Sequence, residues 1–292
     1  MTQRSIAIAT CAGLPDLDHD GPALLAALQR KNLNGVPVVW DDPEVDWTQF
    51  ALVVIRSTWD YVYKYDAIQT WLGSIEQTVP LANPSDVILW NMDKRYLRAL
   101  QEADLPVTPT WWPATPQDIP DLDDFVVKPT VSAGCLDTAR FHGGQGDEAG
   151  ALIASIQASG RTAMIQGYVP SVDIHGETAL LFLGGEYSHA IRKGGMLTHD
   201  QGLEKALFRP EDIAARAATD AEIQTAQRVL DSIPFQRSDL TYARVDLVLD
   251  DTGEPMVLEL ELFEPSIFLG YDDLAADRVA AAIAAHPALA GV

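Results

Sequence analysis

The chain has 292 residues, 47% of them hydrophobic, and its 42 acidic and 20 basic residues give a net charge of −22. That length suffices for a full core in two or three lobes, while so large an acidic excess disfavours nucleic acids and anionic membranes as partners. Cys11 and Cys135 form no disulfide framework or zinc motif, and no apolar run is long enough to cross a bilayer. We therefore expect a cytoplasmic protein in a reducing compartment.

The first hundred residues predict a parallel α/β domain. Apolar runs predict strands over 5–11, 36–40 and 51–55, and helical spacing predicts a helix over 22–31. In parallel sheets ligands bind beyond the carboxyl ends of the strands. The polar segment after the third strand therefore supplies candidate substrate-binding residues, namely Arg56, Ser57 and Asp60. Helix capping is the alternative role for Ser57.

The middle of the chain is expected to form a second lobe. Helices are predicted over 66–77 and 90–103, and five prolines between Pro106 and Pro120 then indicate an extended connector. Beyond it the pattern predicts a strand, a helix and a strand, over 125–129, 147–158 and 164–169.

Lys128 is the most suggestive residue of this lobe, because it closes an apolar strand and precedes the small-residue loop Ser132-Ala133-Gly134. A lysine there can neutralise a phosphate, and a glycine loop lets backbone N–H groups approach phosphate oxygens. A lysine that extends from a strand end to solvent is the alternative. The loop is not a Walker A sequence, and no Gly-x-Gly-x-x-Gly follows the first strand.

The last third of the chain predicts paired strands and two helices. The expected elements are strands over 179–183 and 187–191, a helix over 219–232, a hairpin over 241–262 and a helix over 272–285.

The hairpin carries three carboxylates in a defined register. A two-residue turn at Thr252-Gly253 places Asp246 opposite Glu259 and Arg244 opposite Glu261. Period-2 alternation puts these four side chains on one face. Three adjacent carboxylates repel one another unless they are neutralised, and a hard divalent cation would neutralise them. Solvent-facing acidic decoration is the alternative.

The same register divides the remaining hairpin residues between two faces. Val248 and Val257 share the carboxylate face. The other face is expected to be a dry core face of Val245, Leu247, Leu249, Met256, Leu258 and Leu260.

In its order of motifs the chain resembles the ATP-grasp superfamily over about residues 90–270. Members carry a lysine ahead of the central lobe, matched by Lys94, and a second at a strand end before a glycine loop, matched by Lys128. A hinge segment over 166–169 then holds adenine through backbone atoms, and an acid seven residues after the hinge start is matched by Asp173.

The later motifs of the superfamily also have counterparts. Gly176-Glu177 is followed by an Arg-x-Asp pair at Arg244 and Asp246 and by a magnesium platform at Glu259 and Glu261. In the platform Glu261 stands where members usually have Asn.

A second departure concerns a basic residue that members often carry two positions after Gly-Glu. Ala179 stands there in this chain, so Arg192 and Lys193 are expected to supply the positive charge near the γ-phosphate. A solvated hairpin end is the alternative place for this pair.

The resemblance implies an ATP-grasp fold of the α/β class, in which an N-terminal parallel α/β domain precedes two α+β lobes that sandwich ATP. The expected boundaries are 1–104, 105–167 and 168–292. The residues implied to bind ATP are Lys94, Lys128, Ser132, Ala133, Gly134, Gln166, Gly167, Tyr168, Val169 and Asp173.

The resemblance also implies the other parts of an active site. Mg²⁺ is assigned to Asp246, Glu259 and Glu261, and charge stabilisation during transfer to Arg244, Arg192 and Lys193. Substrate binding is assigned to Arg56, Ser57, Asp60 and Ser266, where Asp60 and Arg56 receive the amino and carboxylate groups of an amino acid.

At finer grain the chain resembles the branch that contains the O-ureido-serine cyclo-ligase of cycloserine biosynthesis. The shared pieces lie at 56–61, 90–97, 188–193 and 259–265. This implies activation of a carboxylate as an acyl-phosphate, attack by the substrate's own ureido nitrogen, and release of ADP and phosphate. An intermolecular carboxylate–amine ligase, peptide-forming or glutathione-synthetase-like, is the first alternative, and a non-catalytic nucleotide-binding protein is the second.

The expected partner is a small amino-acid-like substrate, without nucleic acid or membrane. A monomer and a homodimer both remain open, as does the chirality of the substrate.

Overall fold

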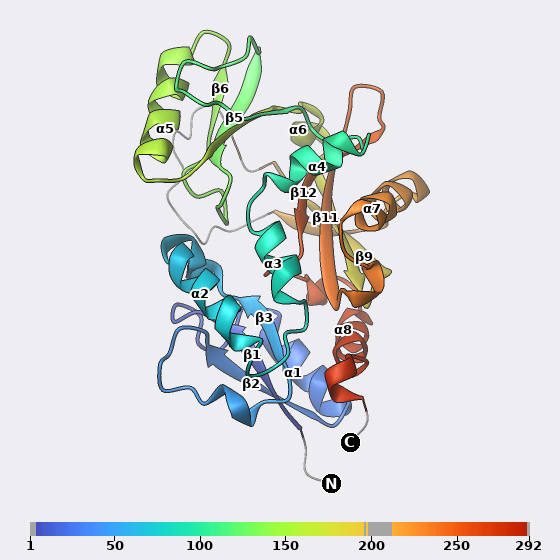
Figure 1. Ribbon diagram of the computed structural model, residues 1–292. Coiled ribbons are helices and arrows are strands. Elements are labelled where there is room, and N and C mark those ends of the chain that lie inside the picture. Colours follow the sequence, from blue (N-terminus) through green and yellow to red (C-terminus); the bar gives the residue numbers. More distant parts are fainter. Residues whose placement is uncertain (1–3, 196, 198–211, 291–292) are drawn as a thin grey trace.

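The computed structural model describes residues 4–195, 197 and 212–290. They form three lobes in a column, each built on one sheet (Figure 1). The parallel three-stranded sheet lies at the bottom, the five-stranded sheet in the middle and a four-stranded sheet at the top. The ATP-grasp arrangement of one α/β domain and two α+β lobes is therefore present.

The N-terminal lobe contains the predicted parallel sheet, in the order β2-β1-β3. Its strands are Arg4–Thr10 (β1), Leu33–Val39 (β2) and Val53–Ser57 (β3). Apolar residues along β1 are fully buried because helices cover both faces. The helices that follow along this part of the chain are Gly21–Arg30 (α1), Tyr65–Ile75 (α2), Ser85–Asn91 (α3) and Tyr96–Glu102 (α4).

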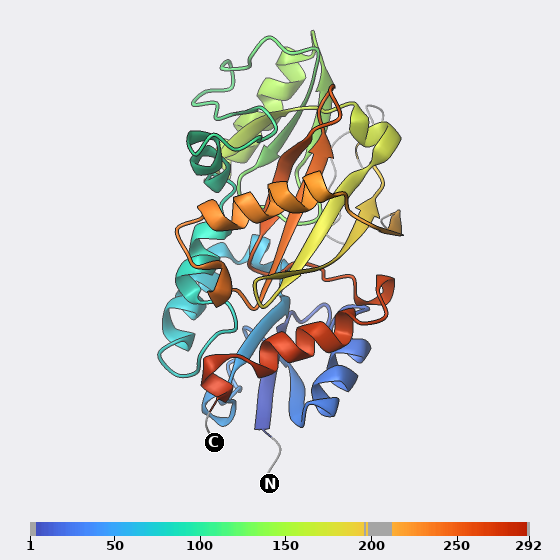
Figure 2. The ribbon, with the colours of Figure 1, turned by 90° about the vertical axis from the view of Figure 1, so that its right-hand side faces the viewer.

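The last helix of the chain, Ala275–Ala284 (α8), packs on the N-terminal lobe beside α1 (Figure 2). Val279 and Ile283 of α8 share one core with Leu24 and Leu28 of α1, and Arg30 pairs with Asp277 across the two helices. The segment expected as the third lobe thus returns to the first, and it ties the two ends of the chain together.

The central lobe is an antiparallel sheet in the order β4-β7-β5-β6, with one helix on it. Its elements are Thr110–Trp111 (β4), Asp124–Pro129 (β5), Ala139–His142 (β6), Gly146–Ala158 (α5) and Ala163–Gly167 (β7). Ala149, Ile153 and Ile156 of α5 pack on Phe125 and Val127 of β5. This packing leaves the opposite face of β5, which carries Lys128, toward the rest of the protein.

The C-terminal lobe is an antiparallel sheet in the order β10-β9-β8-β11-β12. Its elements are Ser171–His175 (α6), Glu177–Leu183 (β8), Glu186–Lys193 (β9), Ile213–Arg216 (β10), Asp220–Ser232 (α7), Tyr242–Leu249 (β11) and Pro255–Glu261 (β12). Helix α7 begins with a capping box between Thr219 and Glu222 and buries Ala226, Val229 and Leu230 on one face of the sheet.

The hairpin of β11 and β12 has the predicted pairing at its carboxylates. Arg244 lies opposite Glu261, and Asp246 lies opposite Glu259. The predicted turn is wrong, since a backbone hydrogen bond closes a loop over 251–253 that ends at Gly253 with φ of +87°. Glycine suits this left-handed conformation, which side chains rarely adopt.

A β-bulge corrects for the longer turn. The register shifts between Asp246 and Leu247, so that Leu258 is an additional residue in β12. The bulge moves Val257 to the buried face, opposite Leu247, whereas the sequence placed Val257 with the carboxylates. It also turns Leu258 into the wall of the cavity described below, instead of the dry core.

None of the helices among residues 4–195, 197 and 212–290 combines the length and hydropathy that a membrane span requires.

Candidate active site

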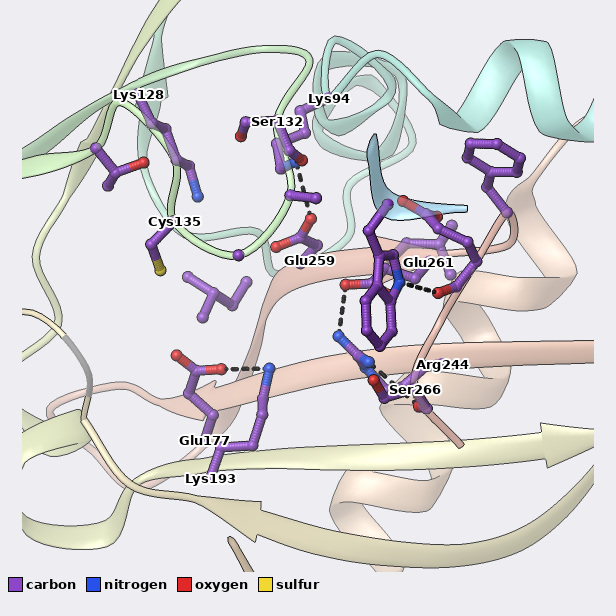
Figure 3. Close-up of a pocket in the computed structure, with 18 of the residues that line it drawn as sticks. Lys94, Lys128, Ser132, Cys135, Glu177, Lys193, Arg244, Glu259, Glu261 and Ser266 are labelled. Atoms are coloured by element: carbon purple, nitrogen blue, oxygen red, sulfur yellow. Dashed lines mark hydrogen bonds and ion pairs between the residues drawn. The ribbon is translucent and has the colours of Figure 1, made fainter. Parts of the chain in front are cut away.

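A cavity of about 780 Å³ lies where the three lobes meet. The N-terminal lobe contributes Trp59 and Tyr61, the central lobe Lys128 and Gln166, and the C-terminal sheet a wall that includes Glu259. In Figure 3, Lys128 and Lys193 extend from opposite walls toward the middle of this cavity. The cavity has the size and lining of a small-molecule site.

Most of the predicted site residues line this one cavity. They are Lys94, Lys128, Ser132, Ala133, Gly134, Gln166, Gly167, Tyr168, Val169, Lys193, Arg244, Glu259, Glu261 and Ser266. Asp246 lies just behind the lining, where it is 1% exposed and is held by cations that do line it. The residues that the sequence predicted but that lie outside the lining are Arg56, Ser57, Asp60, Asp173 and Arg192.

Two lysines on the central side of the cavity differ in their partners. Lys94 Nζ donates to the Ser132 carbonyl at 2.9 Å and lies 3.1 Å from Glu259 Oε1. Burial lowers the pKa of Lys94, but the charge and hydrogen bond of Glu259, together with the charges of Glu261 and Glu264, raise the pKa overall. The Lys128 ammonium group forms no hydrogen bond or ion pair within the part of the chain that the structure describes. Its pKa is lowered, chiefly by burial, so its ammonium group lacks a counter-ion in this state.

Arg244 organises the C-terminal wall. Its Nε and Nη2 donate to the two oxygens of Asp246 at 2.8 and 3.0 Å, and Nη2 also donates to Glu261. Its Nη1 donates to the Ser266 carbonyl at 3.3 Å, and the guanidinium lies 5.6 Å from the centre of the Phe268 ring. The pKa of Arg244 is raised because the charges of Asp246 and Glu261 outweigh its burial.

Lys193 is the second cation that holds Asp246. Its Nζ lies 2.5 Å from Asp246 Oδ2 and 2.8 Å from Glu177 Oε2. Burial opposes the charge of Lys193, but the two carboxylates outweigh it and raise the pKa. Glu177 belongs to the Gly-Glu motif, for which we predicted no role, and it lies on the cavity wall.

The carboxylates fit a magnesium ion by their chemistry, because carboxylate oxygens are its preferred protein ligands. Among residues 4–195, 197 and 212–290, however, no three acidic, histidine or cysteine side chains are already arranged around a metal position. Each predicted ligand is engaged by a cation instead: Glu259 by Lys94, and Asp246 and Glu261 by Arg244. Burial raises the pKa of Glu261 to about 8 despite Arg244, so this carboxylate is short of positive charge.

The structure places Arg192 away from the cavity. Its Nε donates to the His175 carbonyl and its Nη1 to Asp212, both on the outer side of β9. Adjacent residues of a strand point to opposite faces, so the side chains of Arg192 and Lys193 lie on opposite sides of the sheet. The structure therefore gives no support to the predicted role of Arg192 near the γ-phosphate.

The polar segment at the end of β3 also differs from its predicted role. Asp60 accepts from Trp40 Nε1 at 2.8 Å and from Lys64 Nζ at 2.7 Å, and Ser57 Oγ pairs with Thr10 Oγ1 at 2.8 Å. Arg56 is 2% exposed. These contacts stabilise the N-terminal lobe and leave none of the three side chains on the cavity lining.

The predicted ribose acid, Asp173, lies next to the hinge but is engaged by its neighbours. The Tyr168 hydroxyl donates to Asp173 Oδ1 at 2.6 Å, and Arg140 Nη1 lies 3.5 Å from Asp173 Oδ2. The Arg140 guanidinium also stacks on the Tyr168 ring, 3.2 Å from its centre. The Asp173 side chain is nevertheless 51% exposed, and a carboxylate accepts more than one hydrogen bond, so a nucleotide hydroxyl can donate to it beside the Tyr168 hydroxyl.

The lining residues that sequence reasoning missed include Asp18, Tyr61 and Glu264. Burial raises the pKa of Glu264 to about 7, although the charge of Lys94 opposes this. Glu264 lies three residues after Glu261 of the predicted metal platform, which was a usable signal. Asp18 lies in the loop after β1, and strand periodicity gives no indication of where a loop side chain points.

Comparisons with known proteins agree with this geometry. Residues 6–83 match the family model of the N-terminal domain of D-cycloserine synthetase DcsG. The chain is 35% identical to the cycloserine biosynthesis protein DcsG of Streptomyces lavendulae, over 96% of this chain and 97% of that protein.

Solved structures give the same result. The crystal structure of D-cycloserine synthetase DcsG superposes with a TM-score of 0.87 at 33% identity and covers 96% of this chain and 98% of that one. ATP-grasp ligase PsnB, complexed with minimal precursor, Mg and ADP, superposes with a TM-score of 0.64 at 17% identity and covers 97% and 98%. At that identity the second likeness bears on the fold only.

Proposed function

Because this chain belongs to the ATP-grasp ligase family that includes the cycloserine biosynthesis protein DcsG, we propose that it uses ATP and Mg²⁺ to close O-ureido-serine into cycloserine, with release of ADP and phosphate. The substrate is a small amino-acid-like molecule. The observation that carries the proposal is the convergence of Lys94, Lys128 and Lys193 on one cavity whose wall also holds Glu259 and Glu261.

The phosphate groups of ATP would lie against the two lysines of the central side. Lys128 has no partner among the described residues, so a phosphate oxygen supplies the counter-charge that it lacks. Lys94 already bridges the Ser132 carbonyl and Glu259, and it can keep these contacts while it donates a third hydrogen bond. Gly134, at φ of +58°, lets the loop backbone approach the phosphates closely.

The magnesium ion would be held by Glu259 and Glu261, with Asp246 behind them. When bound, it neutralises charge on the phosphate oxygens. The residues of the chain prepare the site by keeping the three carboxylates on one wall. Arg244 and Lys193 hold Asp246, so that its charge stays buried beside the cavity.

The substrate carboxylate becomes an acyl-phosphate by attack on ATP, with loss of ADP. The oxygen-bound ureido nitrogen would then attack the acyl carbon and expel phosphate, which closes the ring, and hydrolysis would remove the carbamoyl group from the ring nitrogen as carbon dioxide and ammonia. Arg244, which lines the cavity, would stabilise the negative charge that develops on the acyl oxygen, a contribution of roughly 3 kcal/mol for a well-placed donor. Lys193, rather than Arg192, is the second cation on this wall.

The test is a product analysis with each enantiomer of O-ureido-serine, ATP and Mg²⁺, without any added amine. We expect ADP and cycloserine to form in equal amounts. A coupled assay measures the ADP, and mass spectrometry measures the cycloserine. ADP that appears only after a second amine is added would support an intermolecular ligase instead. Absence of ADP with both enantiomers, with and without amines, would contradict the proposed function.

A further inference from the structure

A buried polar cluster lies at the carboxyl end of the N-terminal sheet. It consists of Asp18 and Asp20, from the loop between β1 and α1, and of Arg56 on β3. Arg56 Nη2 lies 3.5 Å from Asp18 Oδ2 and 4.0 Å from Asp20 Oδ2. The three residues are only 8%, 2% and 2% exposed, respectively. This cluster has no part in the phosphate and metal chemistry described above.

The cluster is only partly satisfied by hydrogen bonds. Asp20 Oδ1 accepts from the Leu269 N–H at 2.9 Å, and Asp18 Oδ1 accepts from the Asp20 N–H at 3.2 Å. Arg56 Nη1 donates to the Pro265 carbonyl at 2.5 Å. Within the described residues, Asp18 Oδ2, Asp20 Oδ2 and Arg56 Nη2 have no hydrogen-bond partner. Buried groups of this kind are costly to leave unpaired, so they indicate a site for a further polar group.

The charges of the cluster do not balance either. Two carboxylates face one guanidinium, which leaves one negative charge in excess. The His19 ring lies 3.9 Å from Asp20 Oδ1, but the His19 side chain is 66% exposed. A buried excess of one negative charge is stabilised by one cation, and an ammonium group provides both the charge and the hydrogen-bond donors.

The cluster is connected to the reacting end of the cavity. Asp18 lines the cavity together with Ser266 and Phe268. Two consecutive carbonyls of the same segment join the cluster to Arg244, because Arg56 donates to the Pro265 carbonyl and Arg244 donates to the Ser266 carbonyl. An ammonium group at Asp18 is therefore on the same side of the cavity as the guanidinium that faces the acyl group.

We propose that Asp18 binds the α-ammonium group of the substrate, and that Asp20 and Arg56 are positioning residues that hold Asp18 toward the cavity. The inference rests on the proposed function for the reaction itself, and it defines the substrate class as amino acids with a free α-amino group. Asp18 takes the place that the sequence assigned to Asp60, whose carboxylate is already engaged by Trp40 and Lys64.

The test measures binding, so that it does not depend on turnover. Calorimetry with ADP and Mg²⁺ present compares O-ureido-serine with its analogue that lacks the α-amino group. For the wild-type protein we expect the analogue to bind roughly 10- to 100-fold more weakly, as for the loss of a charge-assisted hydrogen bond. Equal affinity for the two compounds would overturn the proposal, and this comparison needs no variant.

Asp18→Asn supplies the second half of the test. The variant should lose the preference for the amino compound and keep the ATP affinity of the wild-type protein, while Asp60→Asn, the matched control, should retain the preference. An Asp18→Asn protein that still prefers the amino compound as strongly as wild type would overturn the assignment of Asp18. The assignment of Asp18 would also be overturned if substrate affinity depended on the concentration of potassium or sodium but not on the amino group of the substrate. Failure of ring closure alone would affect only the proposed function.

Discussion

Lys128→Met removes a buried charge while it keeps most of the side-chain volume. In the nucleotide-free protein the Lys128 ammonium group is buried and has no counter-ion within the described residues. Its pKa is lowered, chiefly because of burial and also because Lys94 repels it. Attraction from Glu259 offsets only part of this. The folded protein thus gains little from this charge. We expect the free energy of unfolding of the variant to be equal to that of the wild-type protein or higher.

ATP binding should respond in the opposite way. If Lys128 donates to a phosphate oxygen, its loss removes a charge-assisted hydrogen bond of about 1.5–3 kcal/mol, which weakens ATP binding by roughly 10- to 150-fold. A simple Coulomb estimate for two unit charges about 4 Å apart, with an effective dielectric constant of about 20, gives about 4 kcal/mol as an upper bound. The predicted pattern is therefore weaker ATP binding without loss of stability.

Calorimetric titration with ATP and chemical denaturation measure the two quantities. Lys64→Met is the matched control, because Lys64 pairs with Asp41 at 2.6 Å and with Asp60 at 2.7 Å outside the cavity lining. The control should keep its ATP affinity and lose up to about 1 kcal/mol of stability, as expected for exposed ion pairs. An unchanged dissociation constant for ATP in Lys128→Met would refute the assignment of Lys128 to a phosphate.

Three further predictions concern the C-terminal wall. Glu259→Gln should lower turnover roughly 100-fold or more while the protein still folds, and near wild-type turnover at saturating ATP and Mg²⁺ would contradict the metal assignment. Burial raises the pKa of Glu264 from 4.5 to about 7, so the folded state retains a proton that the unfolded state releases, and stability falls as pH rises from about 4.5 to about 7. Denaturation should therefore show Glu264→Gln to be more stable than wild type by about 3 kcal/mol at pH 8 and by much less at pH 5, whereas an equal difference at both pH values would count against this reasoning. Arg192→Ala should keep turnover within about twofold of wild type, since Arg192 faces away from the cavity, and a large loss would restore its predicted role.

The hairpin shows how far sequence reasoning reaches. Alternation and a turn signal placed Arg244 opposite Glu261 and Asp246 opposite Glu259, and this pairing is confirmed. The predicted turn was one residue too short, and the bulge at Leu258 compensates for the extra residue of the observed turn. Turn length and bulge are alternative solutions with the same pairing at the carboxylates, so the strand pattern alone does not separate them.

Residues in loops and at strand ends were predicted less well. Strand geometry already implied that Arg192 and Lys193 face opposite sides, so one of the two had to be excluded. For Asp60 and Asp18 the sequence contained no such constraint. Which of these acids reaches the cavity depends on Trp40 and Lys64, which engage Asp60 through contacts that only the folded chain brings together.

The most direct test of the proposed chemistry follows one oxygen atom. In the proposed reaction a carboxylate oxygen of O-ureido-serine attacks the γ-phosphorus of ATP, and attack of the ureido nitrogen on the acyl carbon then expels that oxygen with the phosphate. Substrate labelled with oxygen-18 in its carboxylate should therefore transfer one labelled oxygen to phosphate for each ADP formed, without any added amine. Mass spectrometry that finds unlabelled phosphate alongside labelled cycloserine would contradict the acyl-phosphate mechanism.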